Sequence, residues 1–396
     1  MALPPTEQEV LAMPRRWLML ALGTGAQTAA CAFVYGIPYL AAELRSTEHL
    51  TLTQVGVLVA CPTLGLVLAL VGWGAAADRY GERVVIASGL GLATALLAAA
   101  YTADGMVVLG ILLALAGAAG ASVYSASGRL VMGWFSAKER GLAMGIRQTS
   151  TPLGMGLAAL SMPPLAAAYG VGGAMAFLSG LCGVIALLIA LYAADPPRAA
   201  TSGEANPDTG NPYRGSATLW RIHGAGALLV VPQFTAGAFA LVMLVDVRGW
   251  SAVHAGQLIA GAQVLGALSR VAAGRWSDRV GSRLRPMRQL ALTTAAVVAA
   301  CSLTAAFPSP LTDLALVVAV GITASTNGLS FTATAERAGP AWSGRALGVH
   351  NTGQNLAAAL APPLIGALIT ATGYWPAFAA AAGLACAAAA IVPVTA

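Results

Sequence analysis

The stretch at residues 74–83 reads GAAADRYGER, and it recurs at residues 274–283 as GRWSDRVGSR. The two copies agree at both glycines, at the aspartate and at two arginines. Five matches at fixed positions indicate an internal repeat that covers the two halves of the chain. The matching residues are Gly74, Asp78, Arg79, Gly81 and Arg83 in the first copy, and Gly274, Asp278, Arg279, Gly281 and Arg283 in the second.

Long runs without charged residues flank both copies. The chain is 58% hydrophobic and only 9% charged, which is typical of a protein whose solvent is mostly lipid. A helix needs roughly 20 apolar residues to cross a bilayer. Two runs, 148–194 and 346–396, are twice that length, and turn residues at 163–164, 169–173 and 372–374 divide them. With eight single runs, the sequence predicts an all-α membrane protein of about twelve helices. The single runs are 17–42, 50–77, 84–103, 105–128, 222–245, 249–269, 289–312 and 314–335.

The one long polar stretch, 195–218, divides the chain into two sets of six predicted helices, 1–194 and 219–396. Nearly all basic residues outside the runs fall on one side of the membrane, and only Arg45 and Arg248 fall on the other. The positive-inside rule therefore predicts that both termini are cytoplasmic in a multi-pass protein of the cell inner membrane. Because topology explains the net charge of +6, we expect no nucleic-acid partner.

The repeated motif resembles the signature of the major facilitator superfamily, where it lies in the cytoplasmic loops between helices 2 and 3 and between helices 8 and 9. The resemblance implies two pseudo-symmetric six-helix bundles that bind a small-molecule substrate between them and transport it by alternating access. It also implies that the ten motif residues form a gate on the cytoplasmic side. We expect a monomer that contacts only the lipid bilayer, its substrate, and either a coupling proton or a counter-transported anion.

The physical chemistry of the motif agrees with a gate. Gly74 and Gly274 allow close helix approach, and Gly81 and Gly281 allow a turn. Asp78 and Asp278 are expected to accept hydrogen bonds at a helix N-terminus. For Arg83 and Arg283 we expect contact with water or lipid phosphate.

Three basic residues lie inside predicted helices, where ionisable groups are costly and therefore candidates for function. Arg147, Arg270 and His350 each lie roughly 8 to 12 Å from the cytoplasmic loops, at a rise of about 1.5 Å per residue. Residues 145–149 also align with 348–352, so Arg147 and His350 correspond in the repeat. An anion that bridges two such arginines would relieve their repulsion, which predicts a carboxylate or similar oxyanion as substrate.

A narrower resemblance concerns Arg270. Residues 268–279, LSRVAAGRWSDR, look like helix 8 of oxalate/formate and monocarboxylate transporters, where an arginine four residues before the motif glycine binds the substrate carboxylate. We predict Gln263, Gln354 and Tyr35 as further ligands. The alternative is that Arg147 and Arg270 reach the cytoplasmic interface as structural groups. For His223 and His254, near helix starts, we expect solvated roles.

Other functions remain open within the transporter class. Residues 140–156 partly resemble the glycine-proline motif of drug/proton antiporters but lack its core, so a proton-driven drug or metabolite exporter is the alternative. Coupling through His350, through Glu43 and Asp246, or by anion exchange leaves both symport and antiport open. No paired carboxylates, metal-ligand cluster or nucleophile with a base occurs in the helices, so we expect no enzyme, catalytic residue, cofactor or metal.

Overall fold

The computed structural model describes residues 7–40, 43–44, 49–196, 211–307 and 309–394. Within these ranges the regular elements are helices, and no strand occurs. Ten described segments are long and apolar enough to cross a membrane. Most of the predicted linker, residues 197–210, lies outside the described residues.

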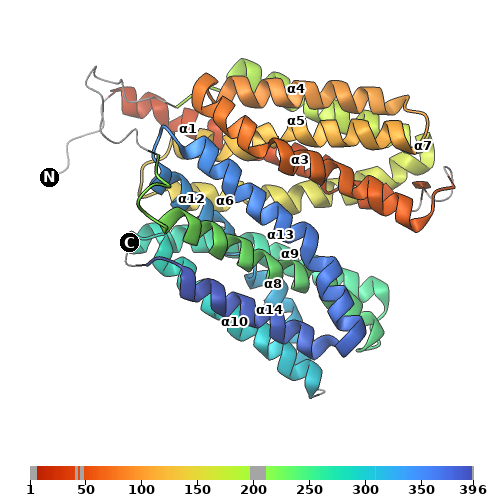
Figure 1. Ribbon diagram of the computed structural model, residues 1–396. Coiled ribbons are helices and arrows are strands. Elements are labelled where there is room, and N and C mark those ends of the chain that lie inside the picture. Colours follow the sequence, from red (N-terminus) through yellow and green to blue (C-terminus); the bar gives the residue numbers. More distant parts are fainter. Residues whose placement is uncertain (1–6, 41–42, 45–48, 197–210, 308, 395–396) are drawn as a thin grey trace. The chain divides into compact units, whose positions relative to one another are not determined.

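The described chain groups into two compact units, and the first comprises Met1–Ser136, Thr149–Thr209 and Ala341–Gly348. Helix α5 packs against α1, α3 and α4, while α7 packs against α1 and α4 (Figure 1). One continuous cluster of buried apolar side chains fills this unit. Its elements are α1 (Glu7–Val34), η1 (Ile37–Leu40), α3 (Leu52–Tyr80), α4 (Glu82–Tyr101), α5 (Met106–Met132), α7 (Ser150–Tyr192) and the first turns of α13 (Ser343–Thr372).

The second unit comprises Ala137–Gln148, Gly210–Pro340 and Val349–Ala396. Helix α14 packs against α8 and α10, and α9 packs against α6 and α11. Two clusters of buried apolar residues lie among these helices. The elements are α6 (Arg140–Arg147), α8 (Thr218–Asp246), α9 (Ala252–Val280), α10 (Leu284–Ala306), α11 (Thr312–Ile322), α12 (Asn327–Ala338), the remainder of α13, and α14 (Tyr374–Ile391).

Small residues set the helix contacts in both units. In unit 1 a Cβ added to Gly117 of α5 would overlap the carbonyl of Pro62 on α3, so the two backbones touch. In α14 the residues that face α8 and α10 are mostly alanines, among them Ala377, Ala381 and Ala385. Apolar burial between helices gains little in lipid, so close backbone approach through small residues is the main source of packing energy.

The helix breaks agree only in part with the sequence. Gly170 divides α7 with a φ of 68°, and Gly373 separates α13 from α14 with a φ of 88°, as the turn residues predicted. The expected interruption at residues 163–164 was wrong, because α7 remains helical through both prolines. Membrane helices tolerate such prolines because neighbouring groups satisfy the freed carbonyls. Two unpredicted breaks separate α6 from α7 and α11 from α12.

The contact between α3 and α5 gives a first prediction. Gly117→Ala should lower the thermal unfolding temperature of the detergent-solubilised protein, because the added methyl group overpacks the contact by about 1–3 kcal/mol. Gly91→Ala is the matched control, since Gly91 is an exposed helical glycine with nothing within 4 Å of an added Cβ. That control should be neutral or stabilising by up to about 1 kcal/mol. Equal unfolding temperatures for the two variants would contradict the close contact.

Candidate functional site

The first motif copy binds the N-terminus of a helix. Asp78, at the end of α3, accepts hydrogen bonds from the backbone N–H groups of Gly344 at 2.9 Å and Arg345 at 3.1 Å, in the first turn of α13. Arg129 of α5 binds the same carboxylate at 2.6 Å and also pairs with Glu82. The carboxylate is buried, with 4% of the Asp78 side chain exposed. An anion at this position compensates the partial positive charge of the helix N-terminus.

The second motif copy does the same at α6. Asp278, at the end of α9, accepts hydrogen bonds from the backbone N–H groups of Gly141 at 2.9 Å and Leu142 at 2.8 Å. The guanidinium of Arg283 binds this carboxylate at 2.6 Å and also contacts Glu336 at 3.4 Å. Both aspartates therefore accept hydrogen bonds at a helix N-terminus, as expected from the sequence. Their role in gating stays a prediction.

In each motif copy, glycines at two successive helical turns let the capped helix and the motif helix touch. An added Cβ on Gly74 would overlap the carbonyl of Gly344, and one on Gly274 would overlap the carbonyl of Gly141. Four residues further along each capped helix, Gly348 meets the carbonyl of Leu70, and Gly145 meets the carbonyl of Arg270. Each contact thus joins a motif helix to a helix with glycines four residues apart, and the internal repeat of the sequence is a repeat of this contact.

The remaining motif residues are partly as predicted. Gly81 and Gly281 adopt positive φ values of 92° and 66°, which the predicted turn requires. Arg79 and Arg279 are exposed. The expectation for Arg283 was wrong, because it is buried with 9% exposed and is held by Asp278, Ser277 and Glu336.

Arg83 is exposed, as expected, but its guanidinium also donates to the carbonyl of Ala190. In the first copy the motif aspartate pairs with Arg345 of α13 at 3.1 Å and, more closely, with Arg129 of α5 at 2.6 Å. The motif alone does not reveal Arg129, because it lies 51 residues away along the chain.

The two predicted interior arginines lie in unit 2, on helices that pack together. Arg147 is the last residue of α6 and is 2% exposed, while Arg270 on α9 is 4% exposed. The α6–α9 contact at Gly145 brings the backbones of these two segments together. The Arg147 guanidinium lies 6.0 Å from the centre of the Phe331 ring on α12. Two buried arginines therefore lie on one packed helix pair.

His350 lies in the same unit and takes part in a hydrogen-bonded network. The ring is fully buried, and its Nε2 contacts the Ser330 hydroxyl at 3.0 Å and the Gln354 amide at 3.2 Å. Its Nδ1 lies 3.1 Å from Nδ1 of His223 on α8. The edge of Phe331 also contacts the ring, with 4.8 Å between ring centres. Phe331 therefore joins Arg147 and His350 through ring contacts.

The other predicted ligands are divided between the units. Gln354 contacts His350, and Gln263 is partly buried on α9, seven residues before Arg270. Tyr35 lies in unit 1, where it is hydrogen-bonded to Tyr124. The structure thus brings Arg147, Arg270, His350 and the two glutamines into one unit, and Tyr35 into a separate polar cluster. That cluster also contains Cys31, whose sulfur lies 3.2 Å from the Tyr124 hydroxyl.

The prediction of a solvated role for His223 was wrong. The residue is 6% exposed and contacts both His350 and the hydroxyl of Tyr213. Sequence reasoning also gave no role to Ser330 and Phe331. The sequence places both residues on a helix of the second half, but it does not indicate which face of that helix packs against α13.

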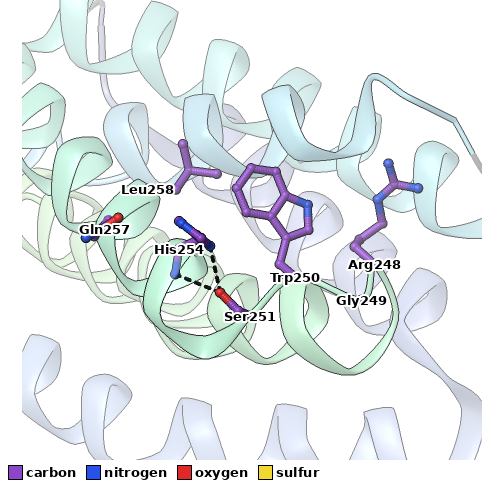
Figure 2. A pocket seen from close by; sticks show the side chains of 7 residues that line it. All are labelled: Arg248, Gly249, Trp250, Ser251, His254, Gln257 and Leu258. Atoms are coloured by element: carbon purple, nitrogen blue, oxygen red, sulfur yellow. Dashed lines mark hydrogen bonds between the residues drawn. The ribbon is translucent and has the colours of Figure 1, made fainter.

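An open pocket of about 730 Å³ lies at the turn between α8 and α9 (Figure 2). Arg248 at its edge binds Asp313 at 2.8 Å, and this hydrogen bond raises the pKa of the guanidinium. Ser251 contacts the exposed ring of His254, as the dashed lines show. None of the predicted substrate ligands lines this pocket.

Comparison with known proteins decides the family. A profile of the Major Facilitator Superfamily matches residues 17–362. The chain belongs to the major facilitator superfamily. An uncharacterized MFS-type transporter of Mycobacterium tuberculosis strain H37Rv is 43% identical over 382 residues, covering 96% of this chain and 85% of the relative. A second uncharacterized MFS-type transporter, from strain CDC 1551, is 42% identical over the same length. The names of these relatives point to a transporter and not to an enzyme.

Solved structures confirm the twelve-helix major facilitator fold. The fucose:proton symporter FucP of E. coli matches with a TM-score of 0.74 at 15% identity, covering 95% of this chain and 98% of that one. The human organic anion transporter MFSD10 matches with a TM-score of 0.74 at 17% identity, covering 96% and 99%. The all-helical fold and the family predicted from the repeated motif are therefore confirmed.

The cap on α6 gives a second prediction for this major facilitator protein. Asp278→Ala should lower the thermal unfolding temperature, because it removes an N-terminal cap of about 0.5–2 kcal/mol and leaves the buried Arg283 without this partner. Asp278→Asn keeps an oxygen acceptor, so the decrease should be smaller. Asp104→Ala, at an exposed loop position, is the control. An unfolding temperature for Asp278→Ala equal to that of the control would contradict the capping role.

Proposed function

We propose that the protein is a secondary transporter of small organic anions in the cell inner membrane, with both termini in the cytoplasm and with Arg147 and Arg270 as the carboxylate ligands. The observation that carries the proposal is the burial of these two arginines on the packed helices α6 and α9. Membership of the superfamily supports transport of a small molecule by alternating access of the bundles 1–194 and 219–396 around the linker 195–218.

Electrostatics supports an anion over a cation. Two guanidinium groups raise the free energy of a bound cation nearby, whereas a carboxylate accepts charge-assisted hydrogen bonds from either. Two described carboxylates near this helix pair, Asp278 of α9 and Glu336 of α12, both bind Arg283. The name of MFSD10 mentions organic anions and that of FucP a sugar with a proton. At such low identity they support only the fold, so the substrate class rests on the arginines.

The capped helices support the proposed gate. In each motif copy a buried aspartate binds backbone N–H groups that cannot find water inside the protein. We propose that these two contacts break and re-form during transport. The arginine beside each aspartate, the partly buried Arg129 or the buried Arg283, then stabilises the carboxylate in whichever state leaves it without the helix N-terminus.

The anion site gives a third prediction, tested in proteoliposomes with radiolabelled lactate, pyruvate, succinate and benzoate. Arg270→Gln should weaken uptake of the transported carboxylate by about 10- to 100-fold, because a hydrogen bond to a charged group contributes about 1.5–3 kcal/mol. Arg270→Lys keeps the charge but not the forked geometry and should retain part of the activity. Arg285→Gln removes an exposed arginine of the same unit and should transport like the unmodified protein.

Unchanged uptake by Arg270→Gln would exclude Arg270 as the carboxylate ligand. If the unmodified protein moves none of the four carboxylates but transports the cationic dye ethidium against a proton gradient, the proposal of an anion substrate is overturned. The alternative of a proton-driven drug exporter would then hold.

A further inference from the structure

Four side chains form a continuous hydrogen-bonded line through unit 2. The hydroxyl of Tyr213 lies 3.0 Å from Nε2 of His223, and Nδ1 of His223 lies 3.1 Å from Nδ1 of His350. Nε2 of His350 then lies 3.0 Å from the Ser330 hydroxyl. Tyr213 precedes α8, is partly buried, and lies within the polar stretch 195–218. The line therefore leads from the edge of the unit to its buried interior.

The contact between the two Nδ1 atoms restricts where protons lie. Two neutral imidazoles at this distance share one proton, so one ring donates and the other accepts. When His350 donates, its Nε2 accepts from Gln354 or Ser330, and His223 Nε2 donates to the Tyr213 oxygen. When His223 donates, every bond in the line reverses, and Tyr213 donates to His223. Both arrangements satisfy both rings, so the pair has two states of similar hydrogen bonding that differ by the transfer of protons.

The surroundings keep the rings dry and in contact. Gly226 on α8 leaves room for the His350 ring, since an added Cβ would lie 2.6 Å from its Cε1 atom. Phe331 from α12 and Trp220 from α8 meet the two rings edge-on. Among the described residues, no carboxylate comes within 4.0 Å of either imidazole. The charged group on the Phe331 side is Arg147, and the remaining polar neighbours are Ser330 of α12, Gln354 of α13 and Tyr213.

We propose that His223 and His350 form the coupling-proton site of the transporter, with Tyr213 as the group that exchanges protons with water. This inference rests on the proposed function as a secondary transporter and identifies what drives it. No buried carboxylate is needed, because the shared proton moves along the line without leaving an isolated charge. Burial raises the pKa of Tyr213 to about 12, so this hydroxyl holds a proton to donate at neutral pH.

The transfer balances at each atom. Tyr213 passes its hydroxyl proton to Nε2 of His223 and regains one from water. The Nδ1 proton of His223 moves to Nδ1 of His350, and the Nε2 proton of His350 passes to the Ser330 hydroxyl. Ser330, whose hydroxyl otherwise donates to the carbonyl of Asn327 at 2.9 Å, releases its own proton to water on the interior side. One proton enters at Tyr213 for each proton that leaves at Ser330. After the transfer His350 carries its proton on Nδ1, and its Nε2 accepts a hydrogen bond. The Gln354 amide then rotates so that its NH2 group, in place of its oxygen, faces this Nε2 atom.

The first test uses the four histidines of the chain, labelled with ¹⁵N and observed by NMR in nanodiscs. His223→Gln should change the ring signals of His350, and Tyr213→Phe should slow the exchange of the shared proton with water. His254→Gln is the matched control, because His254 is exposed and contacts Ser251 instead. Shared-proton exchange that is equally fast in the unmodified protein and in Tyr213→Phe would overturn the proposal.

The second test measures coupling in proteoliposomes that contain the pH dye pyranine, with the same four carboxylates as probes. In His223→Gln, the rate of proton movement and the pH-driven accumulation of carboxylate should both fall by about 100-fold. This is the usual effect of removing a positioned proton-transfer group. The variant's exchange of labelled carboxylate without a pH gradient should be retained, which a merely misfolded variant would not show. Accumulation by His223→Gln equal to that of His254→Gln would overturn the proposal.

The two tests separate the proton site from the substrate. If the unmodified protein moves none of the carboxylates, the anion proposal fails, and the NMR exchange rate still decides the proton site. If carboxylate exchange occurs but no proton moves with it in the unmodified protein, the anion proposal holds and the proton site is overturned.

Discussion

The binding of a buried carboxylate to a helix N-terminus is the interaction on which the candidate site depends. Helix α6 has only eight residues, which is too short to be stable by itself. Its first backbone N–H groups have no partner within the helix, and Asp278 supplies an acceptor for two of them. Since Arg147 ends this helix, the position of one proposed anion ligand follows from a cap at the opposite end. The other proposed ligand, Arg270, lies two turns before Asp278 on the capping helix.

The two copies of this contact differ in the residues at corresponding places. At the α6–α9 contact the residues at corresponding places are Arg147 and Arg270. In the sequence repeat, His350 corresponds to Arg147, and Leu70, which is buried and apolar, corresponds to Arg270. One copy of the repeat thus holds two fixed positive charges, and the other holds a single titratable ring. The arginine beside the motif aspartate also differs, as Arg283 belongs to the motif and Arg129 does not.

Features that depend on neighbours along the chain could be predicted from the sequence. Uncharged runs gave the helices, and the turns at Gly81, Gly281 and Gly373 followed from the freedom of glycine at positive φ. Features that depend on which helix faces pack against each other could not be predicted from the sequence. His223 and His350 are 127 residues apart, and their helices carry no sign that the two rings touch. The break between α11 and α12 spans ordinary small residues, and residues 163–164 continue a helix that their prolines were expected to interrupt.

The proposed carboxylate site and the proposed proton site lie in one unit and are physically consistent with each other. A monocarboxylate and one proton carry no net charge together, so their joint movement costs no work against the membrane potential, which is about 2.3 kcal/mol per charge at 100 mV. Phe331 contacts the ring of His350 and lies beneath the guanidinium of Arg147. A bound anion that draws Arg147 toward it would change the packing of Phe331 on His350. The aromatic ring is therefore the contact through which occupation of one site would alter the proton arrangement of the other.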